Sequence, residues 1–153
     1  MHTHKERRRM PYAVDDVYRV IADIERYPEF LPWCSRLKIR SSEEHDGKTI
    51  LVASMTATFH LVSETFTSRI TLDPAAHAID VEYLEGPFRT LINTWRLSAD
   101  GQNGTLVDFF IEFEFRNRML ELLISTVFQR VVEKLVSAFE ARVHAVQAKA
   151  RAT

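Results

Sequence analysis

Alternation of apolar and polar residues is the dominant pattern in the middle of the chain. Every second residue from 51 to 61 is apolar, and the residues between them are mostly polar. A period of two is typical of a β-strand that buries one face. Five further stretches with one apolar face are expected to be strands, around Leu37 and Ile39; Phe66, Ser68, Ile70 and Leu72; Ile79, Val81 and Tyr83; Leu91, Asn93, Trp95 and Leu97; and Val107, Phe109, Ile111, Phe113 and Phe115. With a strand at the N-terminus, the pattern predicts about seven strands.

Turn-forming residues separate these stretches. Asp46-Gly47, Asp73-Pro74 and Gly86-Pro87 are short turn signals, and residues 100–104 (DGQNG) hold two more. Residues of these types favour the tight connections that join neighbouring antiparallel strands. The strands are therefore predicted to follow one another as an antiparallel meander.

Two stretches follow a helical period and flank the strands. Residues 13–24 place apolar side chains on one stripe, with acidic residues near the N-terminus, where the helix dipole favours negative charge. Residues 118–149 also repeat apolar side chains on one face, which predicts one long helix across the sheet. Its opening turns, 119–128, are apolar on nearly all sides, so one flank lacks an obvious partner within the protein. Residues 147–153 are expected to fray.

The segment between the first helix and the next strand cannot be a regular helix. Residues 27–34 read YPEFLPWC, and each of the two prolines lacks a backbone donor and disfavours helical dihedrals in the residue before it. The segment therefore presents Phe30, Leu31 and Trp33 on a short, kinked connector. Two interpretations stay open: a lid over a space that holds an apolar molecule, or a hydrophobic plug that closes the core.

Together these elements predict an α+β helix-grip fold in one domain that spans residues 1–153. A curved antiparallel sheet wraps around the long C-terminal helix, and the short helix and the kinked segment follow the first strand. Strong curvature separates the sheet from the helix at one end, and the gap either fills with side chains or stays a cavity. Inner-face aromatic residues that can fill the gap are Phe59, Phe66, Tyr83, Trp95, Phe109 and Phe113. Small residues on the same face that would leave room are Ala53, Ala57 and Ser68.

Composition and charge narrow the range of partners. The chain has 153 residues, 46% of them hydrophobic, which suits one globular domain with a core and a modest cavity. Its formal net charge of -1 gives no general reason to expect DNA binding. The single cysteine, Cys34, cannot form an internal disulfide, and the sequence has neither a bilayer-spanning apolar run nor a signal-peptide core. A cytoplasmic protein is expected, with peripheral contact at a bacterial inner membrane as an extension of that expectation.

No catalytic or metal-binding arrangement is predicted. Cys34 has no nearby base and reads best as an inert, partly buried thiol. His2 and His4 share a strand face near the terminus, where two ligands make a weak metal site. The remaining histidines, which show no ligand spacing, are His45, His60, His77 and His144. Strand carboxylates that nothing marks as general acids are Glu64, Glu112 and Glu114.

Four motifs together resemble a known family. They are YPEFLPWC at 27–34, FTSRI at 66–70, GPF at 86–88 followed by Leu91 and Trp95, and DFFIEFEF at 108–115. On these motifs, the protein resembles the coenzyme Q-binding START-like proteins, and the resemblance covers nearly the whole chain. That family is similar to the polyketide cyclase and dehydrase domains and to the bacterial ribosome association toxin.

The resemblance implies a helix-grip fold with a hydrophobic tunnel that holds ubiquinone (coenzyme Q) or a related isoprenoid quinone. The protein would then be a carrier or chaperone that supports respiratory electron transport, with no covalent cofactor and no chemical change to its ligand. Two alternatives follow from the similar proteins: a ribosome-associated inhibitor of translation that is the toxin of a toxin-antitoxin pair, and a polyketide cyclase-like enzyme. The residues expected to contact the ligand are Phe30, Leu31, Trp33, Met55, Phe59, Phe66, Tyr83, Pro87, Phe88, Leu91, Asn93, Trp95, Phe128, Val131 and Leu135.

Polar residues in the sixth predicted strand offer hydrogen bonds to quinone oxygens. Asn93 lies beside Trp95, and Arg89 precedes them on the same face of the alternating strand. A buried Asn can equally be satisfied by backbone groups, and Arg89 at the strand end can reach solvent. Residues 86–88 are either a turn at the tunnel mouth that places Phe88 against the ligand, or simply a turn between strands.

The chain begins with a locally basic segment, residues 2–9 (HTHKERRR). Lys5 and the arginines at 7–9 suit ribosomal RNA or anionic lipid, and they equally suit a charged edge strand that discourages aggregation. RNA recognition usually adds stacking rings, and Tyr12 is the one aromatic ring near this segment. Membrane contact is the more attractive partner hypothesis, because a carrier collects apolar cargo from lipid and the apolar turns at 119–128 can enter the interface.

Overall fold

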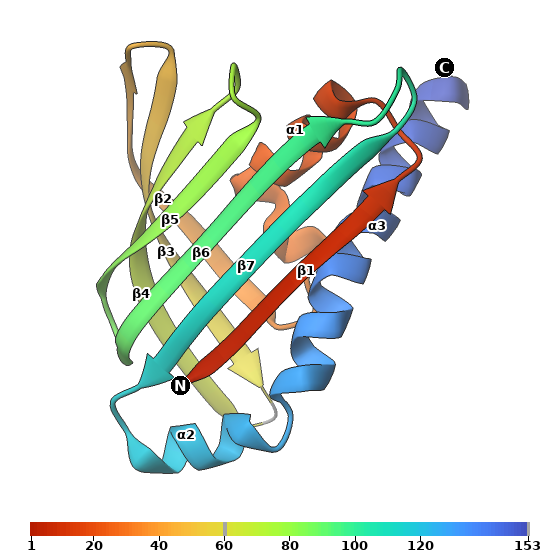
Figure 1. The fold of residues 1–153 in the computed structure, drawn as a ribbon. Helices are drawn as coiled ribbons and strands as arrows, with labels where there is room; N and C mark the ends of the chain where they lie inside the picture. Colours follow the sequence, from red (N-terminus) through yellow and green to blue (C-terminus); the bar gives the residue numbers. More distant parts are fainter. Residues whose placement is uncertain (60, 153) are drawn as a thin grey trace.

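A seven-stranded antiparallel sheet and one long helix form the fold (Figure 1). The computed structural model describes residues 1–59 and 61–152; His60, in the predicted strand over 51–61, and Thr153, in the predicted tail, lie outside the described residues. The strands are β1 (His2–Met10), β2 (Cys34–His45), β3 (Lys48–Phe59), β4 (Val62–Asp73), β5 (Ala78–Glu85), β6 (Phe88–Ala99) and β7 (Thr105–Phe115). The helices are α1 (Val14–Ala22), the 3-10 helix η1 (Ile24–Glu29), α2 (Arg118–Ser125) and α3 (Phe128–Ala152).

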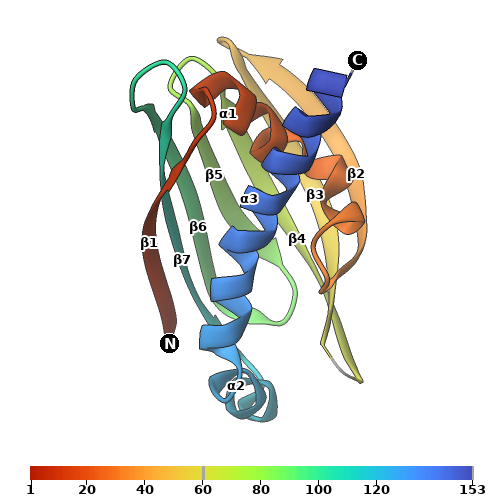
Figure 2. The same cartoon turned by 90° about the vertical axis from the view of Figure 1, so that its right-hand side faces the viewer.

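Strand order follows the chain except for β1. Its partner is β7, so the sheet runs β1-β7-β6-β5-β4-β3-β2, with β1 and β2 at the edges. All neighbouring pairs are antiparallel, as the turn residues predict. The curved sheet holds α3 against its concave face, and α1 packs beside α3 at one end (Figure 2). This arrangement confirms the predicted α+β helix-grip class.

The core is densest where α1 and the second half of α3 meet the sheet. Val17 of α1, Val107 of β7 and Val143 of α3 are almost completely buried there. The ring of Phe139 lies 4.8 Å from the ring of Trp95 in an edge-to-face contact. Close packing of this kind closes the space between the sheet and α3 at the α1 end. At the other end, none of the residues of α2, all of which are described, is buried.

The C-terminal helix is interrupted, contrary to the prediction of one helix over 118–149. It breaks at residues 126–127, and α2 lies across the end of the sheet while α3 runs along its concave face (Figures 1 and 2). The hydroxyl of Ser125 donates to the carbonyl oxygen four residues earlier at 2.7 Å, and that of Thr126 donates to the carbonyl three residues earlier at 2.8 Å. Side chains that bond back to helix carbonyls favour a bend, which apolar periodicity does not reveal.

Local backbone features also change three smaller expectations. The strand predicted over 51–61 ends before the turn, and Leu61 is fully exposed there rather than facing inward. A register shift in β6 turns Arg89 to solvent, which removes it from the inner face and agrees with the solvent interpretation. Residues 147–152 continue α3, although the sequence predicts fraying there.

Candidate functional site

Two adjoining cavities lie between the concave face of the sheet and the helices. The inner cavity, of about 150 Å³, lies nearer to α1, and the outer cavity, of about 190 Å³, lies nearer to α2. The residues that line both are Trp33, Met55, Phe66, Leu91, Ile111 and Leu135. Because they share these walls, the two cavities lie directly beside each other. The sheet and the helix therefore enclose a hollow, as the carrier hypothesis requires.

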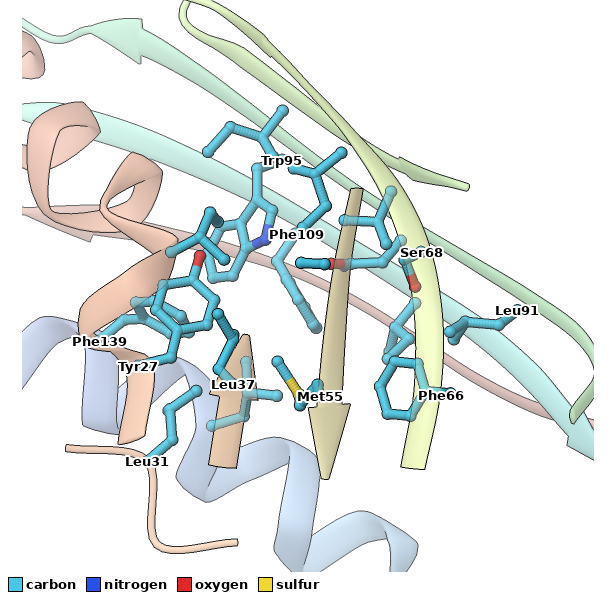
Figure 3. Close-up of a pocket in the computed structure, with 18 of the residues that line it drawn as sticks. Tyr27, Leu31, Leu37, Met55, Phe66, Ser68, Leu91, Trp95, Phe109 and Phe139 are labelled. Carbon is cyan, nitrogen blue, oxygen red and sulfur yellow. The ribbon is translucent and has the colours of Figure 1, made fainter. Parts of the chain in front are cut away.

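Two small residues side by side on neighbouring strands leave room for the inner cavity. Ala53 of β3 and Ser68 of β4 are partners in the strand register, and both are almost fully buried. Larger side chains at these positions would occupy the gap between the sheet and α3. Figure 3 shows Ser68, Met55, Trp95 and Phe109 among the side chains around this space. The other residues that line the inner cavity alone are Ile24, Tyr27, Leu31, Leu37, Ile70, Ile79, Val81, Asn93 and Phe139.

The kinked segment contributes to both the cavity wall and the core. Leu31 and Trp33 line the inner cavity. Phe30 packs edge to face against Tyr27 and Phe139 instead, with ring centroids 5.8 and 5.2 Å apart. The lid interpretation therefore fits Leu31 and Trp33, whereas the plug interpretation fits Phe30.

The outer cavity reaches the surface beside the start of α3. A surface groove shares Trp33, Phe59, Val127 and Val131 with it, so these four side chains form a gate between the cavity and solvent. The other residues that line the groove are Pro32, Thr58, Arg130 and Lys134. The other residues that line the outer cavity alone are Ala57, Val62, Glu64, Phe88, Phe113, Phe115, Leu120, Leu123, Ile124, Phe128 and Val132.

One glutamate ties α2 to the sheet beside the outer cavity. Glu121 accepts a hydrogen bond from the backbone N–H of Phe115 at 2.7 Å, and its other oxygen lies 3.0 Å from Nε2 of His2. The ring of His2 lies 5.2 Å from the rings of both Phe113 and Phe128, which line that cavity. This single carboxylate therefore links α2 to both β7 and β1.

Most of the residues predicted to contact a ligand line one of the two cavities. They are Leu31, Trp33, Met55, Phe59, Phe66, Phe88, Leu91, Asn93, Trp95, Phe128, Val131 and Leu135. Phe30, Tyr83 and Pro87 line neither cavity. The hydroxyl of Tyr83 accepts the backbone N–H of Phe88 at 3.1 Å, and the carbonyl of Pro87 accepts that of Arg116 at 2.9 Å. Tyr83 and Pro87 therefore hydrogen-bond to the backbone around Phe88 and help to fix the position of Phe88 in the cavity wall.

Glu64 is a cavity residue that sequence reasoning missed. It is half-buried in the wall of the outer cavity. The signal was present, because Glu64 stands two residues before Phe66 and alternation places both on the same face of β4. Its carboxylate is the one charged group among the described residues that line either cavity.

Burial keeps the titratable groups beside the inner cavity neutral. It raises the pKa of the Cys34 thiol to about 11, and Sγ lies 3.9 Å from the carbonyl oxygen of Arg36. Burial likewise raises the pKa of Tyr27, whose hydroxyl donates to the carbonyl of Ile21. A thiol with a raised pKa is a poor nucleophile near neutral pH. Within residues 1–59 and 61–152, no three His, Cys, Asp or Glu side chains are placed to hold a metal ion.

The arginines at the start of the chain are paired with carboxylates. Arg7 lies 2.7 Å from Asp108, and Arg9 lies 2.7 Å from Asp100. Arg8 contacts carboxylates of both β1 and α3. The Arg7 guanidinium also holds the pKa of Asp108 below its usual range. These pairs compensate most of the local positive charge, which fits the edge-strand interpretation of this segment.

A helix-grip fold that encloses an apolar hollow defines a START-like protein. The family model described as polyketide cyclase / dehydrase and lipid transport matches residues 10–140. The chain belongs to this family. None of the helices in the described part of the chain is long and apolar enough to cross a membrane.

Relatives of known sequence carry two kinds of name. The chain is 30% identical over 133 residues to the ribosome association toxin RatA of Escherichia coli (strain K12), an alignment that covers 87% of this chain and 81% of the toxin. It is also 30% identical over 141 residues to the mitochondrial coenzyme Q-binding protein COQ10 homolog B of Xenopus laevis, which covers 90% of this chain and 56% of that protein. Both names confirm the family resemblance seen in the motifs.

Solved structures with this fold match almost the whole chain. The 18 kDa protein CC1736 from Caulobacter crescentus superposes with a TM-score of 0.80 at 31% identity, covering 97% of this chain and 99% of that one. A START superfamily protein from Mycobacterium smegmatis superposes with a TM-score of 0.80 at 18% identity, covering 95% and 99%. At that identity, the second match shows the fold alone, and it confirms the START-like architecture.

Proposed function

We propose that the protein binds a neutral isoprenoid quinone of the ubiquinone type and acts as its carrier or chaperone, without transforming it. The observation that carries this proposal is the pair of adjoining cavities, whose described walls are apolar apart from a few uncharged polar groups and Glu64. Apolar walls with few polar groups are typical of sites for apolar small molecules. The relative named as coenzyme Q-binding supports the same ligand class. Support of respiratory electron transport is the role proposed for such a carrier.

Cavity size limits how much of the ligand is enclosed. The two cavities, about 150 and about 190 Å³, together lie just inside the lower end of the usual range for small-molecule sites, about 300 to 1,000 Å³. We expect the quinone ring and the first isoprene units to occupy this space. A longer tail would leave between the gate side chains Trp33, Phe59, Val127 and Val131.

Extraction and fluorescence test the proposal directly. Organic extraction of protein purified from its host should release a quinone that mass spectrometry identifies. Added ubiquinone with two isoprene units should quench the fluorescence of Trp33 and Trp95, because both indole rings line the inner cavity. Extracts that contain no quinone, together with unquenched fluorescence, would exclude the carrier function.

Association with the ribosome is the second candidate function, because a relative is named as the ribosome association toxin. Sedimentation with ribosomal subunits should then be sensitive to salt. Arg7 and Arg9 are already paired with Asp108 and Asp100, so we expect their replacement by Ala to leave any such sedimentation unchanged. Loss of salt-sensitive sedimentation in that double variant would favour RNA binding by β1 instead.

An anionic bilayer is the proposed partner from which the ligand is collected. Met119 and Leu122 on the outer side of α2 are 77% and 65% exposed, and Leu61 in the β3–β4 turn is fully exposed. Arg116, just before α2, and Arg118, its first residue, form no ion pair with any described carboxylate. Exposed apolar side chains beside uncompensated cations suit the surface of an anionic membrane. The same helix lines the outer cavity, so this contact would lie next to the route of the ligand.

Vesicle flotation tests the membrane contact. The protein should float with vesicles of phosphatidylcholine and phosphatidylglycerol, and less with phosphatidylcholine alone. The double variant Met119→Ser, Leu122→Ser should lose this association. Ile92→Ser is the matched control, because Ile92 is 48% exposed on the convex face of the sheet. Equal flotation of the double variant and the wild type would rule out α2 as the contact.

A further inference from the structure

Ser68 carries the one described side-chain oxygen or nitrogen atom that is buried without a hydrogen-bond partner. The residue is 3% exposed and lies in the wall of the inner cavity. A buried hydroxyl without a partner costs free energy, because it gives up its bond to water and gains none in return. Because Ser68 lines the inner cavity, rotation of its side chain would bring the hydroxyl to a molecule bound there, which would supply the missing partner.

Hydroxyl groups on the opposite face of the same two strands are paired. Cross-strand pairs at 2.8 Å join Ser54 to Thr67, Thr56 to Thr65 and Thr58 to Ser63. Ser68 faces the other way, and its partner in the register is Ala53, which has no polar side chain. The unpaired state of Ser68 therefore comes from the cavity and not from a shortage of hydroxyl groups in this part of the sheet.

Two polar groups of β6 also face the inner cavity with bonding capacity left over. Asn93 donates from Nδ2 to the carbonyl oxygen of Phe110 at 2.8 Å, and its Oδ1 accepts no hydrogen bond from the described residues. Trp95 lines the same cavity, and its indole N–H donates to none of the groups that the structure describes. Figure 3 shows Trp95 and Ser68 on different sides of the cavity. A molecule that bonds to both must therefore cross the cavity.

These groups suit a neutral ligand with oxygen atoms. The hydroxyl of Ser68 and the indole N–H of Trp95 can each donate to an acceptor oxygen, and Oδ1 of Asn93 can accept. No charged side chain of the described residues lines the inner cavity, and a carboxylate or phosphate buried there without a cation would be strongly disfavoured. Ser68 and Trp95 stand on β4 and β6, and the register places Trp95 level with Leu72, four residues along β4 from Ser68. Two strand spacings and this offset put the two backbones roughly 16 Å apart.

On the basis of the proposed function, we infer that Ser68, Asn93 and Trp95 form the head-group subsite for the quinone. The ring enters first, and its oxygens accept hydrogen bonds from Ser68 and Trp95. The isoprenoid tail then runs through the outer cavity to the gate. The reverse orientation would place the quinone oxygens among the apolar walls near α2 and leave the Ser68 hydroxyl unpaired.

Ser68→Ala tests the subsite, because it removes the hydroxyl and keeps the cavity. The variant should bind ubiquinone with two isoprene units roughly two- to tenfold more weakly, as measured by quenching of tryptophan fluorescence. Binding of a branched hydrocarbon of similar length should not change, since that probe accepts no hydrogen bond. The infrared carbonyl stretch of the bound quinone should move to higher frequency in the variant, because a hydrogen bond lowers it.

Ser54→Ala is the matched control. Ser54 is 6% exposed, but it faces the outer side of the sheet, where it bonds to Thr67. This variant should lose stability and keep wild-type quinone binding. If the wild type binds quinone and Ser68→Ala binds it equally well with an unshifted carbonyl stretch, the subsite is wrong and the carrier function stands. If the wild type binds neither the quinone nor the hydrocarbon, the proposed function itself fails.

Discussion

Filling the inner cavity should stabilise the protein and weaken ligand binding at the same time. Ala53 is 3% exposed and lines the inner cavity opposite Ser68. Ala53→Leu would extend a branched side chain into empty space rather than against packed atoms. At a fully packed core position, a larger side chain lowers the stability, because it clashes with the atoms around it. Opposite changes in stability and affinity would therefore be diagnostic of a binding cavity.

The expected gain follows from the size of the void. At about 24 cal/mol per Å³, an empty cavity of about 150 Å³ corresponds to about 3.6 kcal/mol of lost packing. The added carbon atoms of Leu recover at most about 2.4 kcal/mol, at about 0.8 kcal/mol for each of about three. Imperfect fit reduces this figure, so we expect a gain of about 1 kcal/mol. In a domain of this length, that gain raises Tm by about 2 to 4 °C.

Thermal unfolding of ligand-free protein and quinone titration provide the two measurements. Ala78→Leu is the matched control, because Ala78 is 7% exposed, lines neither cavity, and accepts a hydrogen bond from the hydroxyl of Tyr18 at 2.9 Å. Overpacking at Ala78 should cost about 1 to 3 kcal/mol. If Ala53→Leu lowers the stability as Ala78→Leu does, the space beside α3 is not a void and the reasoning is refuted.

Replacement of three other side chains tests the edge of the sheet and the buried thiol. Glu121→Ala should speed amide hydrogen exchange in α2, because it removes the acceptor of the Phe115 N–H that joins α2 to the sheet. The control Glu133→Ala on α3 should leave exchange in α2 unchanged. If α2 exchanges at the same rate in Glu121→Ala and the wild type, Glu121 does not hold α2 to the sheet. Arg7→Ala should raise the pKa of Asp108 in an NMR titration, because the Arg7 hydrogen bond is the main cause of its depression; an unchanged pKa would disprove this. Cys34 should react with iodoacetamide far more slowly at pH 8 in the folded than in the unfolded protein, because burial raises its pKa from 9.0 to about 11. The pKa of the Cys34 thiol is higher in the folded than in the unfolded protein. The stability that the neutral thiol contributes is therefore present below pH 9.0 and is lost as the pH rises towards 11. The Cys34→Ala variant should not lose stability in this way over the same pH range.

Side-chain alternation was enough to predict the sheet and much of the cavity wall. Met55, Phe66, Leu91 and Trp95 line the cavities because each occupies an inward position of its strand. A shift of one residue in the pairing of two strands would turn every inward side chain outward. In a sheet with one buried face, the hydrophobic pattern therefore determines the strand register. Glu64 occupies an inward position in the same pattern, although carboxylates in strands more often face solvent.

Interruptions of regular structure were not visible in the pattern. The break between α2 and α3 accompanies hydroxyl groups of Ser125 and Thr126 that bond to helix carbonyls. The exposure of Arg89 comes from a register shift in β6. Both are matters of local hydrogen bonding, which the spacing of apolar residues does not specify.

The sequence by itself determined the strands, the antiparallel meander from β2 to β7 and the apolar character of the interior, because these follow from residues close together along the chain; the place of β1 beside β7 does not. Only the tertiary structure decided that the space beside Ala53 stays open, that the hydroxyl of Ser68 has no described partner, and that Arg7 and Arg9 are compensated by distant carboxylates. Each of these outcomes depends on how closely elements far apart in the sequence approach one another. Packing at that scale is set by the whole fold, so no local pattern contains it.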